Sequence, residues 1–151
     1  MTLLDDIAVW TTACAYEHLI PGGGVGVLLA DGSQAALFRL DDGSVHALGN
    51  IDPFSGAAVI SRGIVGDRGG CATVQSPILK QVFALESGRC LDDPGVAVPV
   101  YQVRITPVFT SRSHGSAHRS DCAVRRSAQI STNFVECQSL NSGLVRANAR
   151  T

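Results

Sequence analysis

Two short stretches of the chain decide its fold: residues 50–70, NIDPFSGAAVISRGIVGDRGG, and residues 76–79, SPIL. Each contains a proline, Pro53 in the first and Pro77 in the second. Proline lacks a backbone donor, so neither stretch around it fits the interior of a central strand. Both proline segments are therefore predicted to be loops that connect strands.

The rest of the first 109 residues is typical of a small antiparallel β-domain. Apolar runs flank turn signals such as Asp31-Gly32-Ser33 and Asp41-Asp42-Gly43. The six prolines fall at proposed turns or strand ends, as a sheet requires. These patterns predict an all-β fold with strands over residues 7–10, 25–30, 34–40, 44–48, 81–85 and 98–106.

The two loops and their surroundings resemble a known family. Residues 47–50, ALGN, lead into the first loop, and residues 83–91, FALESGRCL, and 93–101, DPGVAVPVY, follow the second. In order and spacing these segments resemble the Rieske domain, an antiparallel β-sandwich or barrel. The longer pattern of residues 50–70 is similar to the small subunit of NADH-dependent nitrite reductase, a Rieske-like protein. The resemblance covers roughly residues 7–107.

The resemblance places Asp52, Phe54, Ser76 and Leu79 where a Rieske protein carries the ligands of Cys-Pro-His and Cys-Pro-x-His. A Rieske [2Fe–2S] centre needs two thiolates and two imidazoles. Aspartate is a hard oxygen ligand, serine is a weak ligand, and phenylalanine and leucine cannot bind a metal. We therefore expect no cluster in this chain. Because protein interiors contain few voids, we also expect Phe54 and Leu79 to fill the volume of the missing cluster.

The resemblance implies a small, cofactor-free subunit of a cytoplasmic NADH-dependent nitrite reductase, which reduces nitrite to ammonia in nitrate assimilation. The family's large subunit carries FAD, siroheme and a [4Fe–4S] cluster, so we expect no catalytic residue in this chain. Binding residues concentrate on loops, and polar loop residues are candidate contacts with the large subunit. They are Asp52, Ser55, Arg62, Asp67, Arg68 and Lys80. An alternative is that Asp67 and Arg68 pair only within their own loop.

Two functions of other classes compete with the subunit interpretation. An active Rieske ferredoxin or oxygenase component would need the ligand set that this chain lacks. A stand-alone Rieske-like interaction or regulatory domain without redox activity would need no ligands. The second alternative therefore stays open.

The composition changes after residue 109. Residues 1–109 carry six basic and eleven acidic residues, whereas residues 110–151 carry six arginines, two acidic residues and few apolar ones. Such a segment buries too little apolar surface to offset an ordering cost of about 1–2 kcal/mol per residue. We expect one Rieske-like domain over residues 1–109 and a disordered or weakly helical Ser/Arg-rich tail over residues 110–151. The tail departs from the family, which usually adds a closing strand here.

Several other classes of function are disfavoured. An acidic domain has no general attraction for nucleic acid, and the chain has no run of about 20 apolar residues to cross a membrane. The first residues, MTLLDD, do not resemble a secretory signal, so we expect a cytoplasmic protein.

A possible zinc site has ligands at a helical spacing, His114, His118 and Cys122, with Cys137 as a fourth ligand. Glycine and serine between them disfavour a helix, so we expect no metal site.

Overall fold

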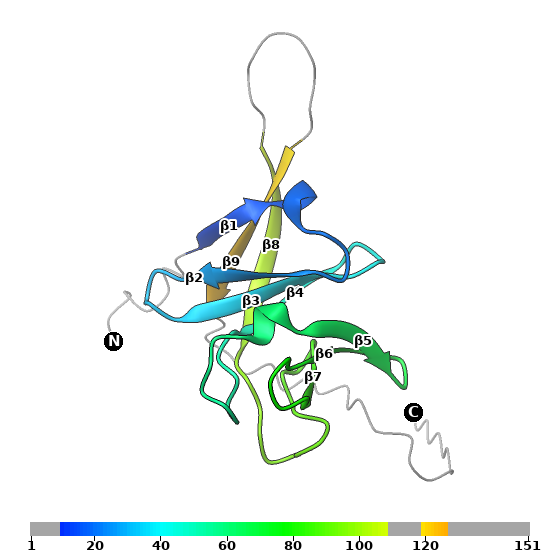
Figure 1. Ribbon diagram of the computed structural model, residues 1–151. Coiled ribbons are helices and arrows are strands. Elements are labelled where there is room, and N and C mark those ends of the chain that lie inside the picture. The colour runs from blue at the N-terminus through cyan, green and yellow to red at the C-terminus, as the bar shows by residue number, and fades with distance from the viewer. Residues whose placement is uncertain (1–9, 109–118, 127–151) are drawn as a thin grey trace, which may run out of the picture.

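The computed structural model describes residues 10–108 and 119–126 of the chain (Figure 1). This part of the chain is β-structure with two short 3₁₀ helices, η1 (Tyr16–His18) and η2 (Ile60–Arg62). The strands are β1 (Thr11–Ala15), β2 (Gly24–Leu28), β3 (Gln34–Arg39), β4 (Val45–Gly49), β5 (Ile64–Arg68), β6 (Cys71–Gln75), β7 (Val82–Ala84), β8 (Val100–Val108) and β9 (Arg119–Arg126). The predicted all-β class is confirmed.

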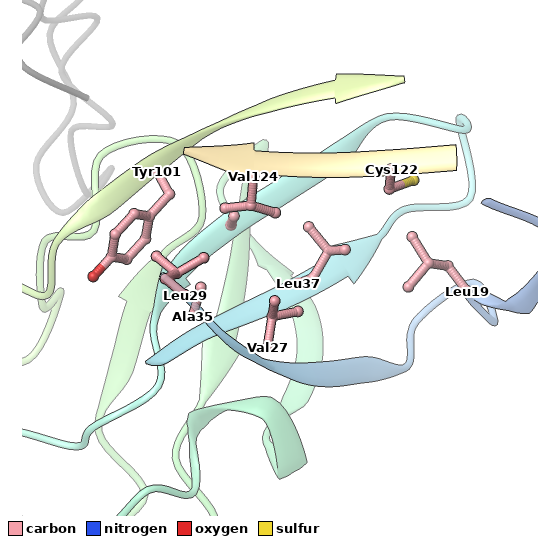
Figure 2. Packing of buried hydrophobic residues seen from close by; sticks show 9 residues of the cluster. Leu19, Val27, Leu29, Ala35, Leu37, Tyr101, Cys122 and Val124 are labelled. Carbon is pink, nitrogen blue, oxygen red and sulfur yellow. The ribbon is translucent and has the colours of Figure 1, made fainter. Parts of the chain in front are cut away.

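The strands form two antiparallel sheets. The larger sheet has the order β1-β9-β8-β4-β3-β2, and the smaller one has the order β5-β6-β7. The larger sheet curls around a cluster of buried side chains from β2, β3, β4, β8 and β9, so it forms a nearly closed barrel. Figure 2 shows labelled members of this cluster, among them Val27, Leu37 and Val124, directed into the same interior.

Strand β3 explains why the domain has two cores. Its apolar run is continuous, and successive side chains point to opposite faces of a sheet. Ala35 and Leu37 pack inside the barrel. Ala36 and Phe38 instead join a second cluster with residues of η2, β6 and β7. The smaller sheet is thus attached to the outer face of the barrel, and the two proline loops lie at its margin.

The expectation of a disordered tail from residue 110 was wrong for residues 119–126. These residues form β9, which pairs with β8 on one side and with β1 on the other. Cys122, Ala123 and Val124 are buried, because the neighbouring strands supply the apolar surface that the Arg-rich segment lacks. The domain therefore does not end at residue 109, and the expectation that a closing strand is missing was wrong. Residues 110–118 and 127–151 lie outside the described residues.

Other expectations for the two ends have mixed outcomes. An opening strand was expected at residues 7–10, whereas β1 covers Thr11–Ala15 and residues 7–9 lie outside the described part.

Cys122 lies on a strand, which removes the helical spacing on which a zinc site would depend. His114, His118 and Cys137 lie outside the described residues. Among the helices that are described, none has the length and apolar character needed to cross a bilayer.

Candidate functional site

The first proline loop joins β4 to η2 and is closed by its own backbone. The Asp52 amide donates to the Ala57 carbonyl at 2.8 Å, and the Gly56 amide donates to the Asp52 carbonyl at 2.7 Å. Gly56 has φ of +72°, a conformation that a residue with a Cβ adopts rarely. The Phe54 amide donates to the Asp52 carboxylate at 2.9 Å, which is the side-chain turn that aspartate favours.

Asn50 anchors this loop to the barrel and to η2. Its side-chain oxygen accepts from the Ser61 amide at 2.8 Å, and its side-chain nitrogen donates to the Gln34 side chain at 3.1 Å. The Asn50 carbonyl also accepts from the Ile60 amide at 3.1 Å. Since Asn50 is buried, these hydrogen bonds satisfy polar groups that water cannot reach. The start of the loop is therefore held at a fixed position.

The second proline loop joins β6 to β7 and is a tight turn. The Ser76 amide donates to the Gln81 carbonyl at 2.9 Å, and the Gln75 side chain donates to the Lys80 carbonyl at 3.1 Å. Lys80 has φ of +67°, and its ammonium donates to the Pro77 carbonyl at 2.9 Å. A lysine in this left-handed conformation is uncommon, so the surrounding hydrogen bonds must hold the turn in this shape.

A buried hydrogen bond joins the two loops. The Ser76 hydroxyl donates to the Asp52 carboxylate at 2.5 Å, and both residues are 0% exposed. Burial alone would raise the pKa of the Asp52 carboxyl, but hydrogen bonds from Ser76, Phe54 and Ser55 outweigh burial and lower that pKa. The Asp52 side chain is therefore a carboxylate at neutral pH.

The residues at the two expected imidazole positions have different environments. Phe54 is half-buried and packs on the second core, with its ring centroid 6.3 Å from that of Phe83. Phe54 therefore packs inward, and whether it occupies the volume of a cluster stays a prediction. Leu79 is 50% exposed, so the same expectation was wrong for Leu79. The tight turn ending at Lys80 carries the Leu79 side chain outward, away from the core.

The donor set at the four positions does not fit a Rieske cluster. Two thiolates and two imidazoles would be needed, and the positions offer a carboxylate, a hydroxyl and two hydrocarbon side chains. Moreover, the carboxylate and the hydroxyl are already bonded to each other. In the described ranges, no three His, Cys, Asp or Glu side chains come together in a way that could hold a metal ion.

The candidate contact residues do not form one cluster. Asp52 is buried, so its side chain is not available to a partner, whereas Ser55, Arg62 and Lys80 are exposed near the loops. Asp67 and Arg68 are exposed at the far end of the β5–β6 hairpin. Because Ile64 pairs with Gln75 beside the second loop, Arg68 lies four residues, or about 13 Å, farther along the strand.

Asp67 and Arg68 form hydrogen bonds of different kinds. The Asp67 carboxylate accepts from the Gly70 amide at 3.0 Å, so it is bonded within its own hairpin turn. The Arg68 guanidinium instead donates to the Asp92 carboxylate at 2.9 Å. This contact lowers the pKa of the Asp92 carboxyl and joins the β5–β6 hairpin to the loop that contains Asp92. The alternative that both residues pair only within their own loop is therefore wrong for Arg68, whereas Asp67 accepts a hydrogen bond from its own turn.

The loops carry an exposed apolar group that was not predicted from the sequence. Ile51 and Ile78 are each 45% exposed, and Leu79 is 50% exposed. We call these three residues the apolar tip. The signal was present in the sequence, because large aliphatic residues in proline-containing loops have no obvious place in a core.

Comparison with known proteins identifies the family. The model of the Rieske-like [2Fe-2S] domain matches residues 9–108. The nitrite reductase (NADH) small subunit of Salmonella typhimurium is 39% identical over 97 residues, which are 64% of this chain and 89% of that protein. The nitrite reductase [NAD(P)H] large subunit of Klebsiella oxytoca is 40% identical over 96 residues, which are 64% of this chain and only 10% of that protein.

A solved structure agrees with these relatives. The crystal structure of an NADH-dependent nitrite reductase small subunit from Mycobacterium tuberculosis superposes with a TM-score of 0.68. It is 72% identical in sequence, and the match covers 78% of this chain and 96% of that one. The two-sheet fold and these matches together lead to one assignment: the chain belongs to the nitrite reductase (NADH) small subunits, which have a Rieske-like domain.

Proposed function

We propose that the chain is the cofactor-free small subunit of a cytoplasmic NADH-dependent nitrite reductase, which reduces nitrite to ammonia in nitrate assimilation. It acts by binding a large subunit that carries FAD, siroheme and a [4Fe–4S] cluster. The observation that carries the proposal is the buried Asp52–Ser76 hydrogen bond, which joins the two loops where a Rieske protein would bind its cluster. On this proposal the hydrogen bond takes over the joining of the two loops from iron ligands.

The similarity to a Klebsiella large subunit supports the proposed partner. A segment like this chain makes up a tenth of that polypeptide, so the two parts can share one chain. We infer that the two parts also work together when they are separate chains. On this view the contact with the large subunit has a polar rim, formed by Ser55, Arg62 and Lys80. A more distant part of the same contact is formed by Asp67 and Arg68.

The partnership is tested by binding and activity together. The full chain is mixed with the purified large subunit loaded with its cofactors, and association and NADH-dependent nitrite consumption are measured. We expect a stable complex and faster nitrite consumption than with the large subunit alone. A chain that neither binds the large subunit nor changes its activity would contradict the proposal and favour a stand-alone interaction or regulatory domain.

The contribution of the basic candidate contact residues, in the rim and in the more distant part, is tested by reversing their charge. Arg62→Glu, Arg68→Glu and Lys80→Glu are combined, because single charges at a rim change association only modestly. All three side chains are exposed, but the variant loses the Lys80–Pro77 hydrogen bond and the Arg68–Asp92 ion pair, so urea unfolding first checks that it is folded. We expect slower association and a changed dependence on salt. Wild-type association at low salt would show that these charges lie outside the contact.

The absence of a cluster is tested on the purified chain. Iron analysis and visible absorption should show neither stoichiometric iron nor the spectrum of a [2Fe–2S] centre, because the two proline loops lack the required thiolate and imidazole ligands. The measurement should be made on protein purified without oxygen, so that loss of a labile cluster cannot explain the result. A stoichiometric [2Fe–2S] spectrum would contradict the proposal.

A further inference from the structure

The surface of the two loops is apolar and carries little charge. The apolar tip consists of Ile51, Ile78 and Leu79, which leave about half of their surface exposed to solvent. Asp52 and Ser76 lie beside these residues in the sequence and are joined to each other in the interior. The hydrogen bond therefore brings Ile51 of the first loop to the same end of the domain as Ile78 and Leu79 of the second.

The ionisable groups of these loops do not interrupt the apolar tip. Asp52 is the only ionisable residue in residues 51–58, and its side chain is buried. Residues 76–79 contain no ionisable side chain, and the ammonium of the following Lys80 donates to the Pro77 carbonyl. The centre of a protein–protein contact is typically apolar and depleted of charge, with polar residues at its rim.

The apolar tip is also held in one shape. The first loop is closed by hydrogen bonds between Asp52 and Ala57 and between Gly56 and Asp52, and the second by one between Ser76 and Gln81. The buried bond between Asp52 and Ser76 then fixes one loop against the other. A surface that is already ordered loses little conformational entropy when a partner binds, so more of its contact energy appears as affinity.

We propose that Ile51, Ile78 and Leu79 form the centre of the contact with the large subunit of nitrite reductase. This inference rests on the proposed function. The large subunit is chosen as the occupant because a segment similar to this chain is part of a large-subunit polypeptide in Klebsiella oxytoca. Ser55, Arg62 and Lys80 are exposed in or near the same two loops and on this view supply the polar rim.

The inference is tested with a variant of the apolar tip and a matched control. The tip variant is Ile78→Ser with Leu79→Ser. The control is Ile20→Ser with Ile105→Ser, which removes two aliphatic side chains that are 73% and 43% exposed. Ile20 precedes β2 at the end of the barrel near Arg39, whereas the first loop lies beyond the opposite end of β3. The control therefore changes the apolar surface far from the loops.

Binding of each full-length variant to the cofactor-loaded large subunit is measured as a dissociation constant, and urea unfolding shows that each variant is folded. We expect the tip variant to bind at least tenfold more weakly and the control to bind like the wild type. If the tip variant fails to fold, Leu79→Ser alone takes its place, with Ile20→Ser as its control.

The outcomes separate this inference from the proposed function. If the wild type binds and the tip variant binds equally well, or the control is weakened as much as the tip variant, the contact lies elsewhere and the proposed function stands. If the wild type itself does not bind the large subunit, the proposed function fails and the inference fails with it.

Discussion

The Ser76 hydroxyl donates a 2.5 Å hydrogen bond to the Asp52 carboxylate, and neither residue is exposed to solvent. The two residues are 24 positions apart, so the bond fixes one loop against another. A hydrogen bond to a buried charged group typically contributes more to stability than one between neutral groups. The consequences of this bond can be measured directly.

Removing the hydroxyl should destabilise the domain. Ser76→Ala leaves the buried carboxylate of Asp52 without one donor, and we expect a loss of about 1–3 kcal/mol in the free energy of unfolding. Urea unfolding measures the loss. The matched control is Ser33→Ala, which removes a hydroxyl that donates to Asp31 at the same 2.5 Å but at an exposed site. An equal loss in both variants would show that burial does not strengthen the Asp52–Ser76 bond.

The Asp52 carboxylate should also make stability depend on pH. Its pKa is lower in the folded state than the value of about 3.9 usual for an unfolded chain. The carboxylate therefore stabilises the fold above that unfolded value, and this stabilisation is lost as the pH falls through the folded pKa. Asp52→Asn should be most destabilised relative to the wild type near pH 6, and the difference should shrink as the pH falls below about 4. Urea midpoints over this range measure the difference, and a constant difference would contradict the assignment.

Strand β9 should be essential to the barrel. Val124 is 0% exposed in the cluster inside the barrel, and Val124→Asp would bury a charge without a partner. We expect a loss of about 3 kcal/mol or more, or failure to fold. Thr12→Asp on the neighbouring strand β1 is exposed and should stay close to the wild type. Thermal unfolding compares the two variants, and a folded Val124→Asp with wild-type stability would show that β9 is dispensable.

Packing of η2 on β2 should tolerate no side chain at Gly24. A Cβ at Gly24 would overlap the Ser61 carbonyl oxygen and lie 2.5 Å from the Phe38 ring. We expect Gly24→Ala to cost about 1–3 kcal/mol through overpacking. Gly26→Ala on the same strand is the control, since its Cβ would be 3.4 Å from the Ser61 hydroxyl. Urea unfolding separates them, and equal stability would mean that η2 can shift freely.

Much of the fold could be predicted because its signals are local. Asp31-Gly32-Ser33 forms a turn in which the Ser33 amide bonds to the Asp31 carboxylate, and the strands on both sides pair as expected. Strand β9 could not be predicted in the same way. Its buried residues, Cys122 to Val124, form a short apolar run between Asp121 and Arg125. Their burial depends on pairing with β1, more than a hundred residues earlier, and on packing against side chains from β2, β3 and β4.

The two loops could be located from the sequence, but their arrangement could not. The spacing of Asp52, Phe54, Ser76 and Leu79 identified both loops, and side-chain chemistry indicated that a Rieske cluster does not fit. The Asp52–Ser76 bond and the outward position of Leu79 depend on how the two loops pack together. The residue pattern of a single strand or loop does not show how that loop packs against another loop.

The position of β1 affects how the chain can fold during synthesis. In the described part of the chain, β1 pairs with β9 alone, and the two strands are separated by more than a hundred residues. A nascent chain that has emerged only as far as β8 has no partner for β1, so closure of the barrel is among the last events of its folding. Such distant pairing slows folding and leaves strand edges open to association with other chains. Ribosomal pausing before β9 should therefore prolong the interval in which this protein depends on chaperones.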